Sequence, residues 1–187
     1  MKKNKAVFLD RDGTIVAHIP YLNSPRQLKL LPHAVEGIRL FKEHGYLVIV
    51  VTNQSGIARG YFDEESLMQI HDKLKKILTQ EKAEVDDIYY CPHYAEGIVE
   101  QYKVHCECRK PRPKMLFDAA KQYNIDLSQS IMIGDSQVDV LVGKEAGCKS
   151  IFIRDANQVS NGGLHFGADY VVKDLLEAAL LVIEKKK

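Results

Sequence analysis

Two carboxylates directly follow a short apolar run near the start of the chain. The run Ala6-Val7-Phe8-Leu9 is followed by Asp10-Arg11-Asp12-Gly13-Thr14. An apolar run that breaks into acidic residues and a glycine is typical of a buried parallel strand ending in a loop, where open α/β sheets bind ligands. Asp10 and Asp12 could aim at one point, one as a nucleophile and the other as a proton donor. A solvated turn explains a lone pair of this kind equally well.

Polar residues also follow two later apolar runs. Thr52-Asn53-Gln54-Ser55 comes after Leu47-Val48-Ile49-Val50-Val51, and Gly134-Asp135 comes after Ile131-Met132-Ile133. Because the carboxyl ends of parallel strands share one edge of a sheet, these side chains are expected to meet the first two carboxylates in one crevice. Asp139 opens the next helical segment, and we expect it to orient the loop rather than to bind a metal.

A second group of residues has the composition of a metal site. Cys91-Pro92-His93 and Cys106-Glu107-Cys108 together supply three thiolates and an imidazole, the ligand set of a closed structural Zn²⁺ site. Redox cysteine pairs usually have two intervening residues, so zinc is favoured over a disulfide. His105 is an alternative to His93 as the fourth ligand. Arg109-Lys110 follows this zinc loop, residues 91–108, so zinc would position two cations.

The overall composition is that of an ordinary globular domain. The 187 residues are 45% hydrophobic and 27% charged, with a net charge of +1, so one domain spanning 1–187 is expected. A near-neutral chain has no global field to gather nucleic acid or an anionic membrane. No apolar run approaches the roughly 20 residues of a membrane span, and the N-terminus lacks an apolar signal-peptide core, which favours a cytoplasmic protein. Its size suggests a monomer.

Apolar runs alternate with amphipathic segments along the chain, which predicts an α/β fold with a three-layer, Rossmann-like parallel sheet. Only 37 residues separate Thr14 from Thr52, and a helix and a strand must fit there, so no large cap domain is expected. The expected strands are 6–9, 47–51, 88–90, 131–133, 150–153 and 170–172, and the expected helices are about 32–44, 64–78, 115–123, 138–146 and 175–185.

Four short motifs come in the order and approximate spacing of the haloacid dehalogenase superfamily of phosphohydrolases, which the chain resembles over about residues 6–153. The motifs are Asp10-x-Asp12-Gly13-Thr14, Thr52-Asn53, Arg109-Lys110-Pro111 and Gly134-Asp135-x-x-x-Asp139.

The resemblance implies Mg²⁺-dependent phosphomonoester hydrolysis. Asp10 would attack phosphorus and form an aspartyl-phosphate, while Asp12 would protonate the leaving oxygen and later deprotonate the hydrolytic water. Mg²⁺ would take an oxygen of Asp10, the main-chain carbonyl of Asp12 and a carboxylate oxygen of Asp135. Thr52 and Lys110 would hold the phosphoryl oxygens.

The zinc loop narrows the resemblance. Tyr89-Tyr90-Cys91-Pro92-His93, Cys106-x-Cys108-Arg109-Lys110-Pro111 and the run 52–60 are similar to the D-glycero-D-manno-heptose 1,7-bisphosphate 7-phosphatases, with histidinol-phosphatases next. The expected partner is then a small phosphorylated sugar. One position departs from the family pattern, because Ser136 stands where the family commonly has Lys, and this affects substrate identity rather than reaction class. The resemblance assigns substrate contacts to Arg109, Asn53, Gln54, Ser55 and the loop from His18 to Tyr21.

Four other functions are weighed against this one. A histidinol-phosphate phosphatase shares the chemistry and the zinc loop but is disfavoured by Ser55-Gly56-Ile57-Ala58-Arg59-Gly60. A DNA 3′-phosphatase would need a basic stripe to bind nucleic acid, and this near-neutral chain has none in its sequence. A phosphoacceptor or nucleotide-binding module has to keep its phosphoryl group, so it would not need a base at Asp12. A purely structural zinc protein would not explain the carboxylates at the ends of the strands.

Overall fold

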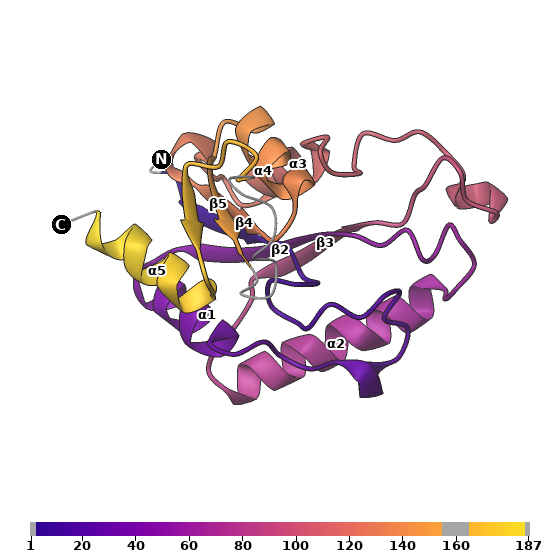
Figure 1. Cartoon of the computed structure of the whole chain (residues 1–187), viewed down its shortest axis with the longest axis horizontal. Helices are drawn as coiled ribbons and strands as arrows, with labels where there is room; N and C mark the ends of the chain where they lie inside the picture. The colour runs from indigo at the N-terminus through magenta and orange to yellow at the C-terminus, as the bar shows by residue number, and fades with distance from the viewer. Residues whose placement is uncertain (1–2, 155–164, 186–187) are drawn as a thin grey trace.

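The protein is built on one six-stranded parallel sheet (Figure 1). The computed structural model describes residues 3–154 and 165–185. The strand order is β3-β2-β1-β4-β5-β6, so the chain moves outward from β1 in one direction and then starts again on its other side at β4. The carboxyl ends of β1 and β4 therefore flank a topological switch point, with the end of β2 next to that of β1. The strands are β1 (Ala6–Leu9), β2 (Leu47–Asn53), β3 (Asp87–Cys91), β4 (Ile131–Gly134), β5 (Lys149–Ile153) and β6 (Tyr170–Val172).

Helices cover both faces of the sheet, as Figure 1 shows, and give the three layers expected from the sequence. The main helices are α1 (Ala34–Glu43), α2 (Glu64–Gln80), α3 (Lys114–Gln122), α4 (Gln137–Glu145) and α5 (Leu175–Glu184). Alternate residues of each strand point to opposite faces, so Val7 and Leu9 of β1 pack with α1, α2 and α5. Ala6 and Phe8 pack with α3 and α4 on the other face. The central strands β1, β2 and β4 are buried on both sides, which explains their mostly apolar sequences.

The expected elements are confirmed, with small differences at their ends. Asp63 caps α2, as predicted, by accepting a hydrogen bond from the Ser66 N–H. β2 ends two residues later than expected, because Thr52 and Asn53 belong to the strand and not to the loop. They stay in register with Tyr90 and Cys91 of β3, which places their side chains on rigid backbone.

Within residues 3–154 and 165–185, no helix combines the length and the apolar character needed to cross a bilayer. The cytoplasmic location and the monomeric state stay predictions from the sequence.

Candidate active site and metal cluster

The loop after β1 is a tight turn that brings its carboxylates to the edge of the sheet. Ile15 N–H and Val16 N–H both donate to the Arg11 carbonyl, and Gly13 N–H donates to the Val16 carbonyl. Gly13 has φ +88°, and a Cβ there would lie 1.9 Å from an Asp135 carboxylate oxygen. The glycine thus lets the loop after β4 approach the loop after β1, which is the convergence expected from the sequence.

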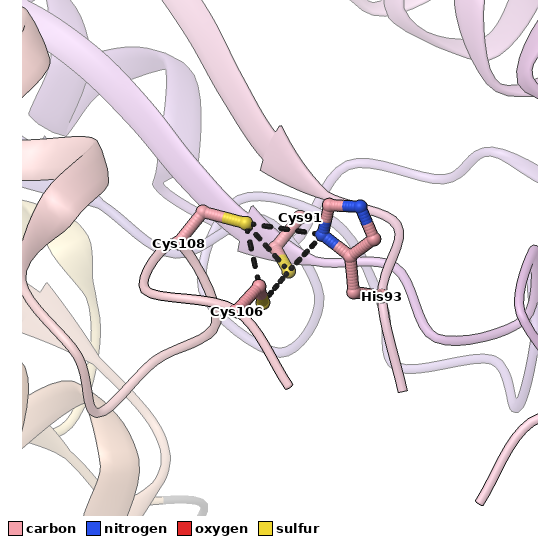
Figure 2. Close-up of side chains that lie close together, drawn as sticks. All are labelled: Cys91, His93, Cys106 and Cys108. Atoms are coloured by element: carbon pink, nitrogen blue, oxygen red, sulfur yellow. Dashed lines mark hydrogen bonds between the residues drawn. The ribbon is translucent and has the colours of Figure 1, made fainter. Parts of the chain in front are cut away.

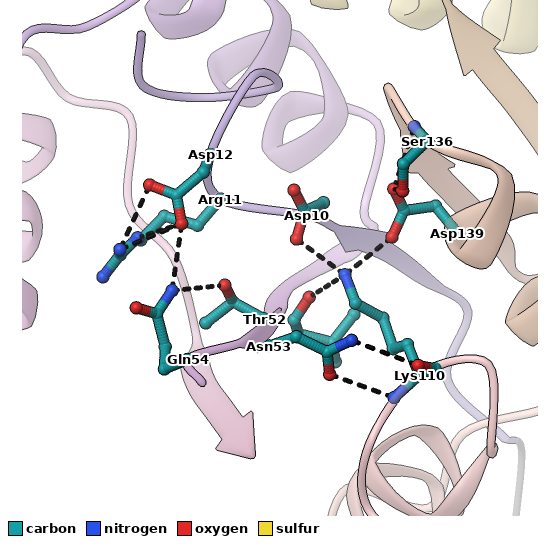
Figure 3. A network of polar contacts seen from close by, with 10 residues as sticks. Asp10, Arg11, Asp12, Thr52, Asn53, Gln54, Lys110, Ser136 and Asp139 are labelled. Atoms are coloured by element: carbon teal, nitrogen blue, oxygen red, sulfur yellow. Dashed lines mark hydrogen bonds and ion pairs between the residues drawn. The ribbon is translucent and has the colours of Figure 1, made fainter. Parts of the chain in front are cut away.

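Lys110 is the buried cation at the centre of the site (Figure 3). Its Nζ donates to Asp10 Oδ1 at 2.6 Å, to Asp139 Oδ1 at 2.6 Å and to the Val51 carbonyl at 2.8 Å. Three acceptors use all three N–H bonds of an ammonium group. The Asn53 side chain holds the Lys110 backbone by accepting from its N–H and donating to its carbonyl. Lys110 therefore neutralises two carboxylates from different parts of the fold, since Asp10 follows β1 and Asp139 lies in the first turn of α4.

Burial sets the electrostatics of these carboxylates. Desolvation raises the pKa of Asp10, and the nearby Asp139 and Asp12 add to this rise, whereas Lys110 opposes it. Burial alone would lower the pKa of Lys110, but the Asp10 and Asp139 carboxylates raise it above its usual value. Desolvation and Asp139 also raise the pKa of Asp135, to about 6. The site has more buried negative charge than Lys110 alone compensates.

This excess of negative charge suits a hard cation. Asp10, Asp135 and Asp139 each offer a carboxylate oxygen within 4.8 Å of the others, and oxygen ligands are those that Mg²⁺ prefers. Both oxygens of Asp139 have partners already, since Oδ1 accepts from Lys110 and Oδ2 from the Ser136 N–H and hydroxyl. Asp139 thus sits where the sequence analysis expects it, in a capping box at the start of α4. Asp10 and Asp135 are better placed as ligands.

Asp12 is held from two sides. Gln54 Nε2 donates to Asp12 Oδ2 at 2.9 Å and to Thr52 Oγ1 at 2.8 Å. Arg11 forms an ion pair with the same carboxylate, with Nη2 2.9 Å from Oδ2. The Arg11 side chain is 1% exposed and the Asp12 side chain 20% exposed, so the carboxylate is the more open member of this ion pair.

A cavity of about 410 Å³ opens over these groups. Ser136, in the loop after β4, also faces it, and this serine is a helix cap rather than a cation. The residues that the sequence analysis assigned to the phosphoryl group and the sugar line the cavity, namely Thr52, Lys110, His18, Tyr21, Asn53, Gln54 and Ser55.

Arg109 lies apart from the other candidate substrate residues. It lines a second cavity of about 290 Å³, which shares Lys110 with the first. Its Nη1 donates to the His93 carbonyl at 3.3 Å, and its guanidinium lies 5.3 Å from the centre of the Tyr94 ring. The zinc loop therefore holds Arg109 beside the main cavity rather than inside it.

The four predicted zinc ligands converge at the end of β3 (Figure 2). The sulfur–sulfur distances are 3.1, 3.4 and 3.5 Å, and His93 Nδ1 lies 3.3 Å from Cys108 Sγ. A tetrahedral zinc with Zn–S bonds of about 2.3 Å separates its sulfurs by about 3.7 Å. The thiols are free rather than disulfide-bonded. The donor set therefore fits Zn²⁺, and it is His93 rather than His105 that lies beside the three sulfurs.

Two features of this site differ from the predictions made on the sequence. The pairing of Lys110 with Asp139 joins segments 29 positions apart and has no local signal. Arg11 lies between two aspartates and has no predicted role, although it is buried and contacts His71 of α2 at 3.2 Å. The signal available for His71 was its place on the apolar stripe of α2, beside Leu67 and Leu74.

Comparisons with known proteins show which family the chain resembles. Residues 107–178 match the HAD-hydrolase-like family model. The D-glycero-beta-D-manno-heptose-1,7-bisphosphate 7-phosphatase of Haemophilus influenzae is 40% identical over 98% of this chain and 100% of its own. A Photorhabdus laumondii enzyme named for the alpha anomer is 38% identical over 81% of this chain and 82% of its own.

A solved structure gives the same result. The D,D-heptose 1,7-bisphosphate phosphatase of B. bronchiseptica, complexed with magnesium and phosphate, matches with a TM-score of 0.84 and 34% identity, over 97% of this chain and 99% of that one. The sequence match and the structural match each cover nearly the whole of both chains that they compare. The chain therefore belongs to the D-glycero-D-manno-heptose 1,7-bisphosphate 7-phosphatase family of haloacid dehalogenase-like phosphatases.

Proposed function

We propose that the protein removes the 7-phosphate of D-glycero-D-manno-heptose 1,7-bisphosphate. The observation that carries the proposal is that Asp10, Asp12 and Lys110 line one cavity in a chain that aligns end to end with relatives named for this reaction. The two carboxylates favour turnover over a module that stores a phosphoryl group, since such a module gains nothing from a base at Asp12.

The proposed reaction uses the two carboxylates in turn. An Asp10 oxygen attacks phosphorus in line with the sugar oxygen, so a bond to Asp10 forms as the bond to the sugar breaks. Asp12 donates its proton to the departing sugar oxygen. Asp12 then takes a proton from water, which attacks the aspartyl-phosphate. Inorganic phosphate leaves, and the Asp10 carboxylate is restored.

Several groups would neutralise the negative charge of the phosphoryl oxygens. Asp10, the main-chain carbonyl of Asp12 and Asp135 would hold Mg²⁺, which supplies positive charge to the phosphoryl oxygens. Lys110 contributes its positive charge through its contact with Asp10. To bond directly to phosphate, its ammonium group would have to give up one of its three present acceptors. Thr52 accepts from Gln54, so its hydroxyl proton is available for a phosphoryl oxygen.

The remaining candidate residues would recognise the sugar and its second phosphate. His18, Tyr21 and Ser55 line the cavity from two loops. Asn53 and Gln54 also line it, but they already hold Lys110 and Asp12, so sugar contacts would come in addition to that role. Arg109 would bind the second phosphate with its guanidinium, the group best suited to a bidentate phosphate contact.

Phosphate release from a substrate panel tests the proposal. The panel holds both anomers of the heptose bisphosphate, fructose 1,6-bisphosphate, histidinol phosphate and a 3′-phosphorylated oligonucleotide. We expect kcat/KM for one heptose bisphosphate to exceed the others by at least about 100-fold, because a site built to bind particular hydroxyls rejects analogues that lack them. Omitting Mg²⁺ should stop release. Even, low activity across the panel would sink the substrate assignment.

The zinc loop leads to a separate prediction. We propose that Cys91, His93, Cys106 and Cys108 bind one structural Zn²⁺. Cys108→Ser should then lower the zinc content and the melting temperature together, because a structural zinc contributes directly to folding free energy. Cys148→Ser is the matched control: Cys148 is buried but lies outside the cluster, so zinc content should not change. One equivalent of zinc retained in Cys108→Ser would show that the ligand set is wrong.

A further inference from the structure

Arg11 is a buried arginine whose guanidinium has partners on two sides. Nε and Nη2 donate to the Asp12 carboxylate at 2.9 to 3.1 Å. On the other side, Nη1 lies 3.2 Å from Nε2 of His71. An arginine has only donors, so Nε2 must accept in this contact and the ring proton must be on Nδ1. His71 is thus the acceptor that the fold provides for the far end of Arg11.

The surroundings of His71 favour this neutral form. The residue is 2% exposed and belongs to the buried face of α2. Burial lowers the pKa of His71 to about 3, together with the positive charges of Arg11 and Lys75. A buried ring nitrogen costs free energy unless it is hydrogen-bonded, and the contact with Arg11 supplies that bond.

A second set of contacts fixes the orientation of the His71 ring. It packs edge to face against Tyr90 of β3, with the ring centres 5.8 Å apart. The Tyr90 hydroxyl donates to Glu64 at 2.9 Å, and Glu64 also accepts from Tyr102 of the zinc loop at 2.8 Å. The His71 ring, which projects from α2, therefore packs against β3 and has little freedom to turn away from Arg11.

We propose that His71 is a positioning residue of the phosphatase, which fixes Arg11 so that Arg11 fixes the Asp12 carboxylate against the leaving oxygen. The proposal rests on the acid role proposed above for Asp12. Without an acceptor at position 71, the buried Nη1 loses its partner, and the guanidinium can rotate away from its paired contact with Asp12 (Figure 3). A displacement of about 1 Å at a catalytic group can cost about 100-fold in rate.

Leaving-group basicity separates this role from a packing role. A misplaced general acid slows departure of a basic leaving group, which needs the proton, more than departure of a weakly basic one. Phenyl phosphate and p-nitrophenyl phosphate have similar shapes and differ mainly in this property. Their kcat/KM values report the step in which the leaving group departs. A general loosening of the fold would lower both values by the same factor.

The test compares His71→Leu, His71→Gln and Tyr90→Phe with the unmodified protein, all loaded with zinc and assayed with Mg²⁺. For His71→Leu we expect a loss of about 10- to 100-fold on phenyl phosphate and less than about threefold on p-nitrophenyl phosphate. His71→Gln keeps an acceptor near Nε2 and should recover most of the loss. Tyr90→Phe keeps the ring contact with His71 and loses only the hydroxyl bond to Glu64, so it should change the ratio of the two substrates much less than His71→Leu does.

Equal losses on both substrates in His71→Leu, or no recovery in His71→Gln, would overturn the proposal. Asp12→Asn is assayed beside them and should show the selective loss in its strongest form. If Asp12→Asn instead slows both substrates equally, Asp12 is not the acid, and the proposal fails together with that role. If Asp12→Asn shows the selective loss and His71→Leu does not, Asp12 keeps its role as the acid and only the role proposed for His71 is overturned.

Discussion

Asp10→Asn is expected to abolish phosphate release while the protein stays folded. The amide has the size of the carboxylate but is not a nucleophile, and removal of an enzyme nucleophile typically lowers kcat by about 10⁴- to 10⁶-fold. The melting temperature should be unchanged or higher, because the substitution removes one of several crowded buried carboxylates and leaves Lys110 paired with Asp139. Phosphate release and circular dichroism check the two expectations.

Asp118→Asn is the matched control for this variant. Asp118 is half exposed on α3 and pairs with Lys114 four residues before it, so the same chemical change there should leave the rate as it was. Near-normal rates of phosphate release in the Asp10→Asn protein would show that Asp10 is not the nucleophile.

Lys110→Met is expected to destabilise the protein and to inactivate it. Loss of the cation leaves Asp10 and Asp139 buried without their partner, and breaking a buried ion pair in this way costs about 3 to 5 kcal/mol. Removing a preorganised charge from a phosphoryl-transfer site should lower kcat by about 10²- to 10³-fold. Urea unfolding and phosphate release measure the two effects.

The loss of stability in Lys110→Met should depend on pH. Desolvation already raises the pKa of Asp10 to about 8 although Lys110 opposes the rise, so loss of the lysine should move this pKa higher still. A carboxyl group with a raised pKa favours folding only while it is protonated, so the deficit should be largest near pH 9, above the Asp10 pKa of the unmodified protein, and smaller near pH 6. Lys114→Met, which removes an exposed lysine, should cost less than about 1 kcal/mol at both values. A pH-independent deficit would contradict the buried carboxylate pair.

The sheet and the strand-end residues were predictable because they depend on local pattern. The continuous apolar run of β2, the cap at Asp63 and the spacing of the zinc ligands each carry their own signal. The end of β2 was misplaced because Thr52 and Asn53 are polar, and only pairing with β3 keeps them in the strand.

The contacts that tune the site were not predictable in the same way. Whether Arg11 lies in solvent or is buried against α2 depends on tertiary packing, and so does its pairing with His71. The contact between Lys110 and Asp139 requires β4 to lie beside β1, which depends on the strand order of the whole sheet.

The most direct test of the proposed function is to follow D-glycero-D-manno-heptose 1,7-bisphosphate with the enzyme and Mg²⁺ by phosphorus NMR, in separate samples of the two anomers. The account predicts that the 7-phosphate signal is replaced by inorganic phosphate while the 1-phosphate signal persists. Prior loss of the 1-phosphate, or an unchanged bisphosphate under conditions where histidinol phosphate is hydrolysed, would contradict it.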